Sequence, residues 1–219
     1  MKRPELVIIA GPSAVGKTTI AHAILKLDPR FEFVRSVTTR AKRGDSFDDE
    51  YLYITREEFL ALIPVRGVLE HTEYAGALYG TPRSEVERIT REGRIPLLVL
   101  DTNGVESVSA IDDIATCGVY VYDDINVMEE RLYARFLGDN PTVEGLKKFT
   151  SRKEQNIADY KRIHGFASAF YAFIENDGTV EDAAHSVIET YESFSHGTPR
   201  DDAKIAEIVT RLHTSVLDK

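Results

Sequence analysis

The stretch "LVIIAGPSAVGKTT" (residues 6–19) decides the fold of this 219-residue chain. It opens with a short apolar run that a glycine stops, a pattern typical of a buried strand. A helix is predicted to follow from Lys17 to about Leu27, because the Asp28-Pro29 pair disfavours further helix. A strand, a glycine-rich turn and a helix are therefore expected in immediate succession.

The turn itself, "GPSAVGKT" (11–18), has the spacing G-x-x-x-x-G-K-[ST]. Its glycines let backbone N–H groups turn inward on a phosphate, and the helix N-terminus adds its positive end. A glycine turn with an incidental lysine is the alternative, but the strand before it and the helix after it favour a nucleoside triphosphate site. Lys17 can then reach the β and γ phosphates, and the Thr18 hydroxyl can join a Mg²⁺ shell. The residues expected to bind ATP here are Gly11, Pro12, Ser13, Ala14, Val15, Gly16, Lys17, Thr18 and Thr19.

The rest of the chain repeats this alternation of strand and helix. Further buried strands are predicted at 95–101, 118–123 and 171–176, and helices at 105–111, over 125–163 with a break at 136–142, and from 179 to about 194. Thr55 and Glu58 are expected to form a capping box at the start of another helix. Thr81 is the expected N-cap of a further helix, with Pro82 in its first turn and Gly93 just past its end. This order predicts an α/β fold with a central parallel sheet whose strand C-termini share one edge.

Composition and charge exclude several classes of protein. The 27 Lys and Arg residues against 36 Asp and Glu give a net charge of -9, which argues against nucleic-acid binding. The apolar run near the N-terminus is too short for a signal peptide, and no run approaches a membrane span. A single cysteine, Cys117, fits a buried strand in a reducing cytosol, and the histidines show no pairing typical of metal ligands. We therefore expect a cytoplasmic protein without a membrane or nucleic-acid partner.

One basic stretch, "VRSVTTRAKRGD" (34–45), contrasts with this acidic chain, and "GVLEHTEYAGALYGTP" (67–82) later places an acid and two tyrosines among small residues. With these motifs, over about residues 5 to 193, the chain resembles the guanylate kinase family, which transfers the γ-phosphate of ATP to GMP. The resemblance implies a P-loop three-layer fold with an inserted nucleoside-monophosphate-binding subdomain and a helical lid. It makes ATP and GMP the expected partners, with Mg²⁺ as the cofactor, in purine metabolism.

The family's acceptor site is similar to "SVTTRAKRGD", which implies that Arg40 and Arg43 bind the GMP phosphate with the hydroxyls of Tyr51 and Tyr79. Planar arginine donors suit a phosphate dianion, although either tyrosine alone could be plain packing. Arg35 and Lys42 match no family position and are expected to be solvated.

The resemblance also implies that Glu70 reads guanine, because a carboxylate can accept from both N1–H and N2–H₂, while adenine would face it with an acceptor. Ser36 and Thr81 could donate hydroxyl protons to O6, and Gly80 lies between the tyrosine and this threonine. Asp101 ends a buried strand near the guanine position; capping the next turn is its competing interpretation.

The lid is expected from "RLYARF", where Arg131 and Arg135 lie on one helix face, and from "RKEQNIAD", where Arg152 is a third candidate for catalysis. A solvated helix face is the alternative for such arginines. Asn176 matches a family position beside the ATP adenine. Ala14 replaces a frequent glycine, which matters only if the backbone needs φ > 0 there. The lid loop is about six residues longer than the family norm.

These matches divide the chain into a guanylate-kinase-like domain, 1–194, and a linker with a C-terminal helix, 195–219. The core is expected at 1–34 and 94–194, the GMP-binding subdomain at about 35–93 and the lid at about 132–160. The tail carries an apolar stripe at helical spacing that packs on the body or on another subunit, so a monomer and a homodimer both stay open.

Two other functions fit parts of this pattern. A guanylate-kinase-like domain can be a non-catalytic binding module, and a kinase of the same fold can act on another acceptor such as ribose bisphosphate. Lys17, Thr18, Arg131 and Arg135 argue against the first, because such modules typically lose these residues. Glu70 argues against the second, because a sugar phosphate has no use for a guanine reader.

Overall fold

A parallel sheet of five strands forms the centre of the computed structural model, which describes residues 5–42, 51–74, 76–138 and 141–219. The strand order is β2-β7-β1-β8-β9, and every neighbouring pair is parallel. The strands are β2 (Phe31–Phe33), β7 (Ile95–Val99), β1 (Glu5–Ala10), β8 (Ala115–Tyr122) and β9 (Ala172–Glu175). The strand that begins the opening motif thus lies in the middle of the sheet, so the loop after it emerges at the centre of one edge.

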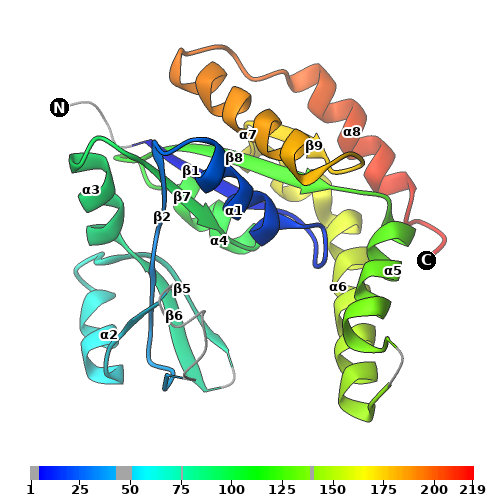
Figure 1. Cartoon of the computed structure of the whole chain (residues 1–219), viewed down its shortest axis with the longest axis horizontal. Helices are drawn as coiled ribbons and strands as arrows, with labels where there is room; N and C mark the ends of the chain where they lie inside the picture. The colour runs from blue at the N-terminus through cyan, green and yellow to red at the C-terminus, as the bar shows by residue number, and fades with distance from the viewer. Residues whose placement is uncertain (1–4, 43–50, 75, 139–140) are drawn as a thin grey trace.

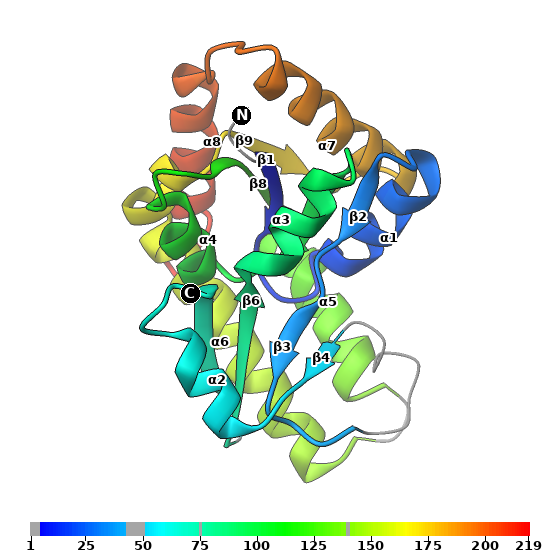
Figure 2. The same cartoon turned by 90° about the vertical axis from the view of Figure 1, so that its left-hand side faces the viewer.

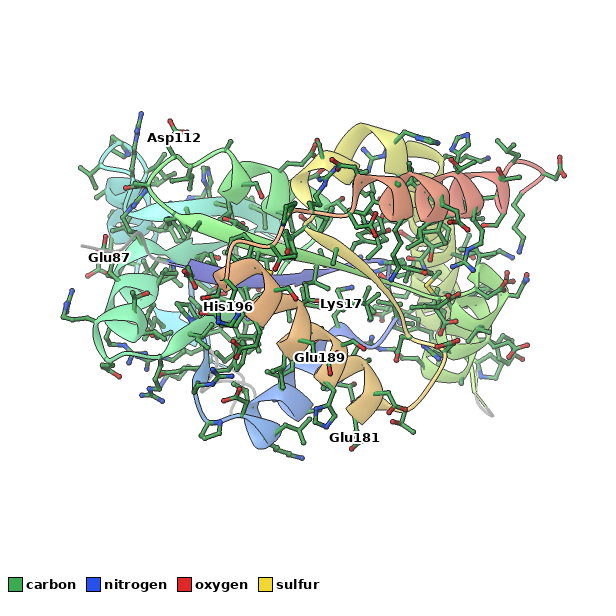
Figure 3. The ribbon with its side chains drawn as sticks, turned by 90° about the horizontal axis from the view of Figure 1, so that it is seen from above. Lys17, Glu87, Asp112, Glu181, Glu189 and His196 are labelled. Atoms are coloured by element: carbon green, nitrogen blue, oxygen red, sulfur yellow. The ribbon has the colours of Figure 1, made fainter. Side chains whose placement is uncertain are left out.

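Helices cover both faces of this sheet. Figure 3 shows α1 (Lys17–Leu27) and α7 (Val180–Ser195) on one side, and α4 (Thr102–Ser109), α6 (Val143–Phe166) and α8 (Asp202–Thr214) on the other. Parallel strands need crossover connections, and the amphipathic helices in those connections bury the sheet from both sides. The three-layer α/β architecture predicted from the sequence is confirmed.

The main hydrophobic core lies around the central strands. Leu6, Val7, Ile8 and Ile9 are all completely buried, as their uninterrupted apolar run predicts for a strand covered on both faces. Cys117 is also buried in β8, and its burial raises the pKa of the thiol to about 12. It is a structural residue, as predicted.

A second sheet is inserted between β2 and β7. Its order is β4-β3-β6-β5, built from β4 (Tyr51–Tyr53), β3 (Ser36–Thr38), β6 (Ala77–Pro82) and β5 (Val68–Tyr74). The helix α2 (Arg56–Leu62) starts with the predicted capping box and packs Phe59 into a small separate core with Val37, Val68 and Leu78. The helix α3 (Arg83–Arg91) leads the chain back to the main sheet. This insertion has a small hydrophobic core of its own, although Leu69 of β5 packs into the main core.

Two arms extend from the same side of the main sheet (Figure 1). One is the inserted sheet with α2, and the other is formed by α5 (Ile125–Phe136) and the N-terminal half of α6. Figure 2, turned by a quarter, shows β3 and β4 in front of α5 and α6. The short 3-10 helix η2 (Ala167–Ala169) then connects α6 to β9.

Three predicted boundaries are wrong by one to three residues. Pro82, not Thr81, is the N-cap of α3, because β6 continues its pairing with β5 through Pro82. The helix α4 starts at Thr102, since the Asp101 side chain accepts from the Gly104 N–H and caps it. The strand β8 begins at Ala115, where pairing with Glu5 already starts.

The C-terminal helix α8 packs on the body of the same chain, against α6 and β9. Its apolar stripe is buried: Ile205, Ile208, Val209, Leu212 and Val216. Arg200, in the linker, donates to the carbonyls of Ser168 and Phe170 and so attaches the linker to η2. Among the described residues, no helix combines the length and the apolar character that crossing a membrane requires.

Candidate active site

The phosphate loop between β1 and α1 is shaped by backbone conformations that few residues adopt. Gly11 has φ 146°, Gly16 has φ 99°, and a Cβ on Gly11 would lie 2.0 Å from the Val121 carbonyl oxygen. Ala14 has φ 66° in the left-handed region, so a residue with a Cβ holds a conformation that favours glycine. The substitution noted in the sequence therefore falls where φ is positive and is not neutral for the backbone.

Lys17 bends back over this loop. Its Nζ donates to the carbonyl oxygens of Gly11 and Pro12, both at 2.8 Å. The pKa of Lys17 is lowered to about 8, mainly by burial; Asp159 and Asp101 oppose the shift, and the nearby Arg152 and Arg135 add to it. Figure 3 shows Lys17 toward the middle of the molecule. An anion beside the Lys17 amine would stabilise its charged form and so raise its pKa again.

A first cavity, which we name the loop cavity, has a volume of about 440 Å³. The phosphate loop and the lid arginines line it together: Ser13, Ala14, Gly16, Lys17, Thr18, Thr19, Arg131, Leu132, Arg135, Phe136 and Arg152. All three arginines predicted for catalysis thus face one space with Lys17. In the described structure this cavity has a strongly cationic lining, which suits a polyphosphate.

The lid arginines differ in how they are held. Arg131 forms an ion pair of 2.8 Å with the buried Asp123, which fixes its direction. The Arg135 guanidinium lies 5.3 Å from the centre of the Phe136 ring, and Arg152 donates to Gln155. Arg131 is therefore preorganised, because a buried carboxylate holds it, whereas Arg135 is exposed and lies beside the Phe136 ring.

A second cavity of about 410 Å³, which we name the carboxylate cavity, lies between the inserted sheet, α4 and α6. Six residues predicted for the GMP site line it together: Ser36, Tyr51, Glu70, Tyr79, Gly80 and Asp101. It shares Ser13, Lys17 and Arg152 with the loop cavity. The two cavities therefore meet at a lysine and an arginine, where the reacting ends of two nucleotides would need compensation of their charge.

Glu70 owes its position to an irregularity of β5. The register of β5 against β6 shifts between Val68 and His71, and such a bulge re-aims the side chain within it. Opposite it, a Cβ on Gly80 would lie 2.9 Å from the Glu70 carbonyl oxygen, so glycine permits the close approach. Burial raises the pKa of Glu70, while the Thr81 hydroxyl, which donates at 2.6 Å, lowers it. Thr81 is completely buried and directs its proton to Glu70.

Asp101 combines both interpretations made from the sequence. Its Oδ1 accepts from the Gly104 N–H at 2.8 Å, and the residue also lines the carboxylate cavity. The hydrogen bond from Gly104 fixes the Asp101 side chain, and its position in the cavity lining would let it contact a ligand there.

The aromatic side of the acceptor region holds Arg40. Its guanidinium lies 5.3 Å and 5.5 Å from the ring centres of Tyr51 and Tyr53, and it donates to the Tyr53 hydroxyl at 3.1 Å. Tyr51 in turn meets Tyr79 edge to face. Arg43 lies outside the described residues. The contact of Tyr53 with Arg40 was not predicted, because an aromatic residue in a strand is usually explained by packing alone.

One expectation about the basic stretch is wrong. Arg35 was expected to be solvated, but it forms an ion pair of 3.0 Å with Glu85, a buried residue at the start of α3. Lys42 is exposed, as expected, and lies 5.3 Å from the centre of the Tyr53 ring.

Two asparagines hold the phosphate loop from outside. The buried Asn176 donates to the Val15 carbonyl at 2.8 Å, so its amide is engaged with the loop. Asn156, on α6, bonds to both peptide groups of Ser13. Sequence reasoning missed Asn156, and also Asp159, which lines the carboxylate cavity. The available signal was their helical spacing from Arg152, four and seven residues on.

The fold and the site define a nucleotide-binding protein of the P-loop class, with a second ligand cavity beside the loop. Residues 3–194 match the sequence family described as guanylate kinase, and the chain belongs to this family. The match covers nearly the whole described body and ends just before the linker that precedes α8.

Individual relatives agree with this assignment. The chain is 35% identical over 132 residues to a guanylate kinase of Synechocystis sp., covering 60% of this chain and 69% of that one. It is 34% identical over 187 residues to a guanylate kinase of Clostridium perfringens (strain SM101 / Type A), covering 84% and 81%. A crystal structure of guanylate kinase from Anaplasma phagocytophilum has the same fold, with a TM-score of 0.57 at 23% identity over 89% and 88% of the two chains.

Proposed function

We propose that this protein transfers the γ-phosphate of ATP to GMP, and also to dGMP, giving ADP and the nucleoside diphosphate. The observation that carries the proposal is the meeting of the two cavities at Lys17 and Arg152. One cavity has the lining that a triphosphate needs, and the other has the half-buried carboxylate of Glu70 and two tyrosines. A γ-phosphate and an acceptor phosphate can therefore lie end to end between them.

In the donor site, the loop amides and the N-terminus of α1 bind the phosphates of ATP. Lys17 leaves the Gly11 and Pro12 carbonyls and contacts the β and γ phosphates. Thr18 and Thr19, the next residues of α1, line the same cavity and lie beside the phosphates. Asn176 supports the loop through Val15, so it acts on the nucleotide through the backbone.

In the acceptor site, Glu70 accepts from the N1–H and N2–H₂ groups of guanine, and Ser36 lies in the same cavity to donate to O6. Because Thr81 donates to Glu70, it orients the carboxylate and does not need to touch the base. Tyr51 and Tyr79 bind the GMP phosphate with Arg40 and Arg43. Adenine would leave the carboxylate facing an acceptor, which costs on the order of 1–3 kcal/mol or more.

Mg²⁺ fits this donor set as an ion that arrives with ATP. Among the described residues no three carboxylate, histidine or cysteine side chains gather as a metal cage, and Thr18 offers one hydroxyl in the loop cavity. Magnesium commonly binds in this way, through substrate phosphates, water and few protein ligands. When bound, Mg²⁺ would neutralise part of the phosphate charge.

The protein contributes alignment and positive charge to the transfer. Arg131, Arg135 and Arg152 surround the moving phosphoryl group and stabilise the charge that develops on its oxygens. The inserted sheet (about 35–93) and the helical arm (about 132–160) act as the GMP-binding subdomain and the lid, and their closure excludes water. No general base is required, because the acceptor phosphate is already an anion.

An assay of ADP release with GMP, dGMP, AMP, UMP and ribose bisphosphate as acceptors tests this function. We expect turnover with GMP and dGMP only. Turnover with ribose bisphosphate but not GMP would show that the protein is instead a kinase of the same fold that acts on a sugar phosphate. No turnover with any acceptor, despite measurable ATP binding, would favour a binding module.

A further inference from the structure

A buried side chain amide connects the lid helix α6 to the phosphate loop. Asn156 is 1% exposed, its Oδ1 accepts from the Ser13 N–H at 2.7 Å, and its Nδ2 donates to the Ser13 carbonyl at 3.0 Å. Only one orientation of the amide satisfies both peptide groups, because the N–H needs an acceptor and the carbonyl a donor. Ser13 is thus held on both sides by one side chain.

The residue next to Ser13 is the strained one. Ala14 has φ 66°, a left-handed conformation that disfavours residues with a Cβ. On its other side, the Val15 carbonyl accepts from Asn176. The left-handed turn at Ala14 is therefore bracketed by two asparagines from separate elements, and such conformations persist when the surrounding structure fixes them.

The place of Asn156 in α6 adds a second consequence. After Gly145 at its start, the buried residues of this helix begin at Asn156 and continue with Asp159, Tyr160 and Ile163. Asn156 is therefore the point where α6 leaves the arm and enters the body. Arg152, one turn earlier, lines both cavities, so the bond to Ser13 also fixes the helix that carries this arginine.

We propose that Asn156 is a positioning residue for the phosphate donor: it holds the loop in the left-handed turn at Ala14 and keeps α6 in register with the loop. The inference rests on the proposed function only in taking ATP as the ligand of the loop. Asn156 touches no substrate in this role, and because both of its hydrogen bonds go to the phosphate loop, its effect falls mainly on ATP and only weakly, through Arg152, on GMP.

Binding of ATP and of GMP to the full-length protein, measured separately by calorimetry, tests this inference. Asn156→Ala should weaken ATP binding by about tenfold, the order of one to two net hydrogen bonds, and change GMP binding by less than about twofold. Asn156→Asp keeps the shape and the acceptor for the Ser13 N–H but loses the donor to its carbonyl, so it should weaken ATP binding as well. Val209→Ala, which removes buried volume in α8, is the control for a general loss of stability.

Replacing Ala14 distinguishes positioning from a merely structural bond. In an Ala14→Gly background the left-handed turn no longer needs enforcement, so Asn156→Ala should cost ATP binding about threefold instead of about tenfold. An unchanged ATP affinity in folded Asn156→Ala, or equal losses for ATP and GMP, would overturn the inference. If Asn156→Ala does not fold, Asn156→Asp with normal ATP affinity would overturn it equally. ATP binding is read without any acceptor, so a failure of GMP transfer would leave this test intact.

Discussion

The loop cavity takes most of its lining from one turn of the chain, whereas the carboxylate cavity collects side chains from β3, β4, β5, β6, α4 and α6. Their chemistry differs in the same way. The first presents main-chain groups with Lys17 and three arginines, which suits any polyphosphate. The second presents Glu70, Asp101 and Asp159, which suit hydrogen-bond donors on a particular base. In our proposal, charge binds the phosphate donor, and side chains from distant segments select the acceptor.

The largest effect that separates the cavities should come from Lys17→Ala. Removing the ammonium that both cavities share should lower kcat by about 10³-fold or more, because it stabilises the charge of the transferring group. GMP binding should change little, since Glu70, Tyr51 and Tyr79 remain. Steady-state kinetics and GMP calorimetry together check this, and a parallel loss of GMP affinity would show that the two sites are not separable.

Glu70→Gln should impair the carboxylate cavity and leave the loop cavity intact. The amide keeps the shape but presents N–H₂ to the guanine donors, so kcat/KM for GMP should fall by about 10- to 100-fold. ATP binding should stay at the wild-type level because Glu70 lines only the carboxylate cavity. Ser107→Ala is a suitable control, since Ser107 lines the same cavity but its hydroxyl donates to the Asn103 carbonyl. A Glu70→Gln protein that uses GMP normally would contradict our account of base recognition.

The same contrast explains what could be predicted from the sequence. The phosphate-loop side of the loop cavity follows from local order, because Gly11 to Thr18 are consecutive and their conformation belongs to one turn between a strand and a helix. The arginines on its other side were named through the family resemblance. The carboxylate cavity could be named only through the family resemblance. No local pattern shows that a bulge near Glu70 faces Gly80, or that Asp159 from α6 lines the same space.

Some errors also have a physical cause. Arg35 reads as a solvated charge because its partner Glu85 is fifty residues away and becomes buried only when α3 folds back to the main sheet. For Ala14 the sequence left the cost of replacing glycine dependent on the sign of φ, and the structure shows that φ is positive. Asn156 was missed because its partners are backbone atoms of Ser13, and its helical spacing from Arg152 does not reveal that contact.

A smaller effect should appear in the number of protons that the protein takes up or releases when each nucleotide binds. The pKa of free Lys17 is about 8 because burial disfavours the ammonium, and ATP phosphates should raise it again. ATP binding should therefore take up about half a proton at pH 8, and its affinity should fall as pH rises above about 8, by up to tenfold per pH unit. Calorimetry in buffers of different ionisation heat measures the uptake. Lys17→Arg, which stays charged, should abolish it.

GMP should move protons in the opposite direction. Burial raises the pKa of Glu70, and the guanine donors favour its carboxylate, so GMP binding should release a proton at acid pH. GMP affinity should accordingly fall as pH decreases through the raised pKa of Glu70. Because the GMP phosphate also titrates, the measured quantity is the difference between wild type and Glu70→Gln. Equal proton release in both proteins would exclude Glu70 as the source.

The smallest effect should come from Arg35, which lies in the basic stretch but belongs to neither cavity. It pairs with Glu85, and Glu85 also accepts from Arg88, so Arg35→Ala leaves this buried carboxylate with Arg88 as its partner among the described residues. Burial alone would raise the pKa of Glu85, but the bonds from Arg88 and Arg35 lower it overall.

Because Arg35 is half exposed, its loss should cost about 1 kcal/mol of unfolding free energy or less. Arg88→Ala should cost more, since Arg88 also pairs with Glu32 and Glu92 and is better buried. Urea unfolding of both variants measures the two costs, and GMP kinetics of Arg35→Ala complete the comparison. A KM for GMP raised tenfold would place Arg35 in the acceptor site. An unchanged KM with a slightly lower stability would show that Arg35, although it lies in the basic stretch, has a structural role: it attaches α3 through Glu85.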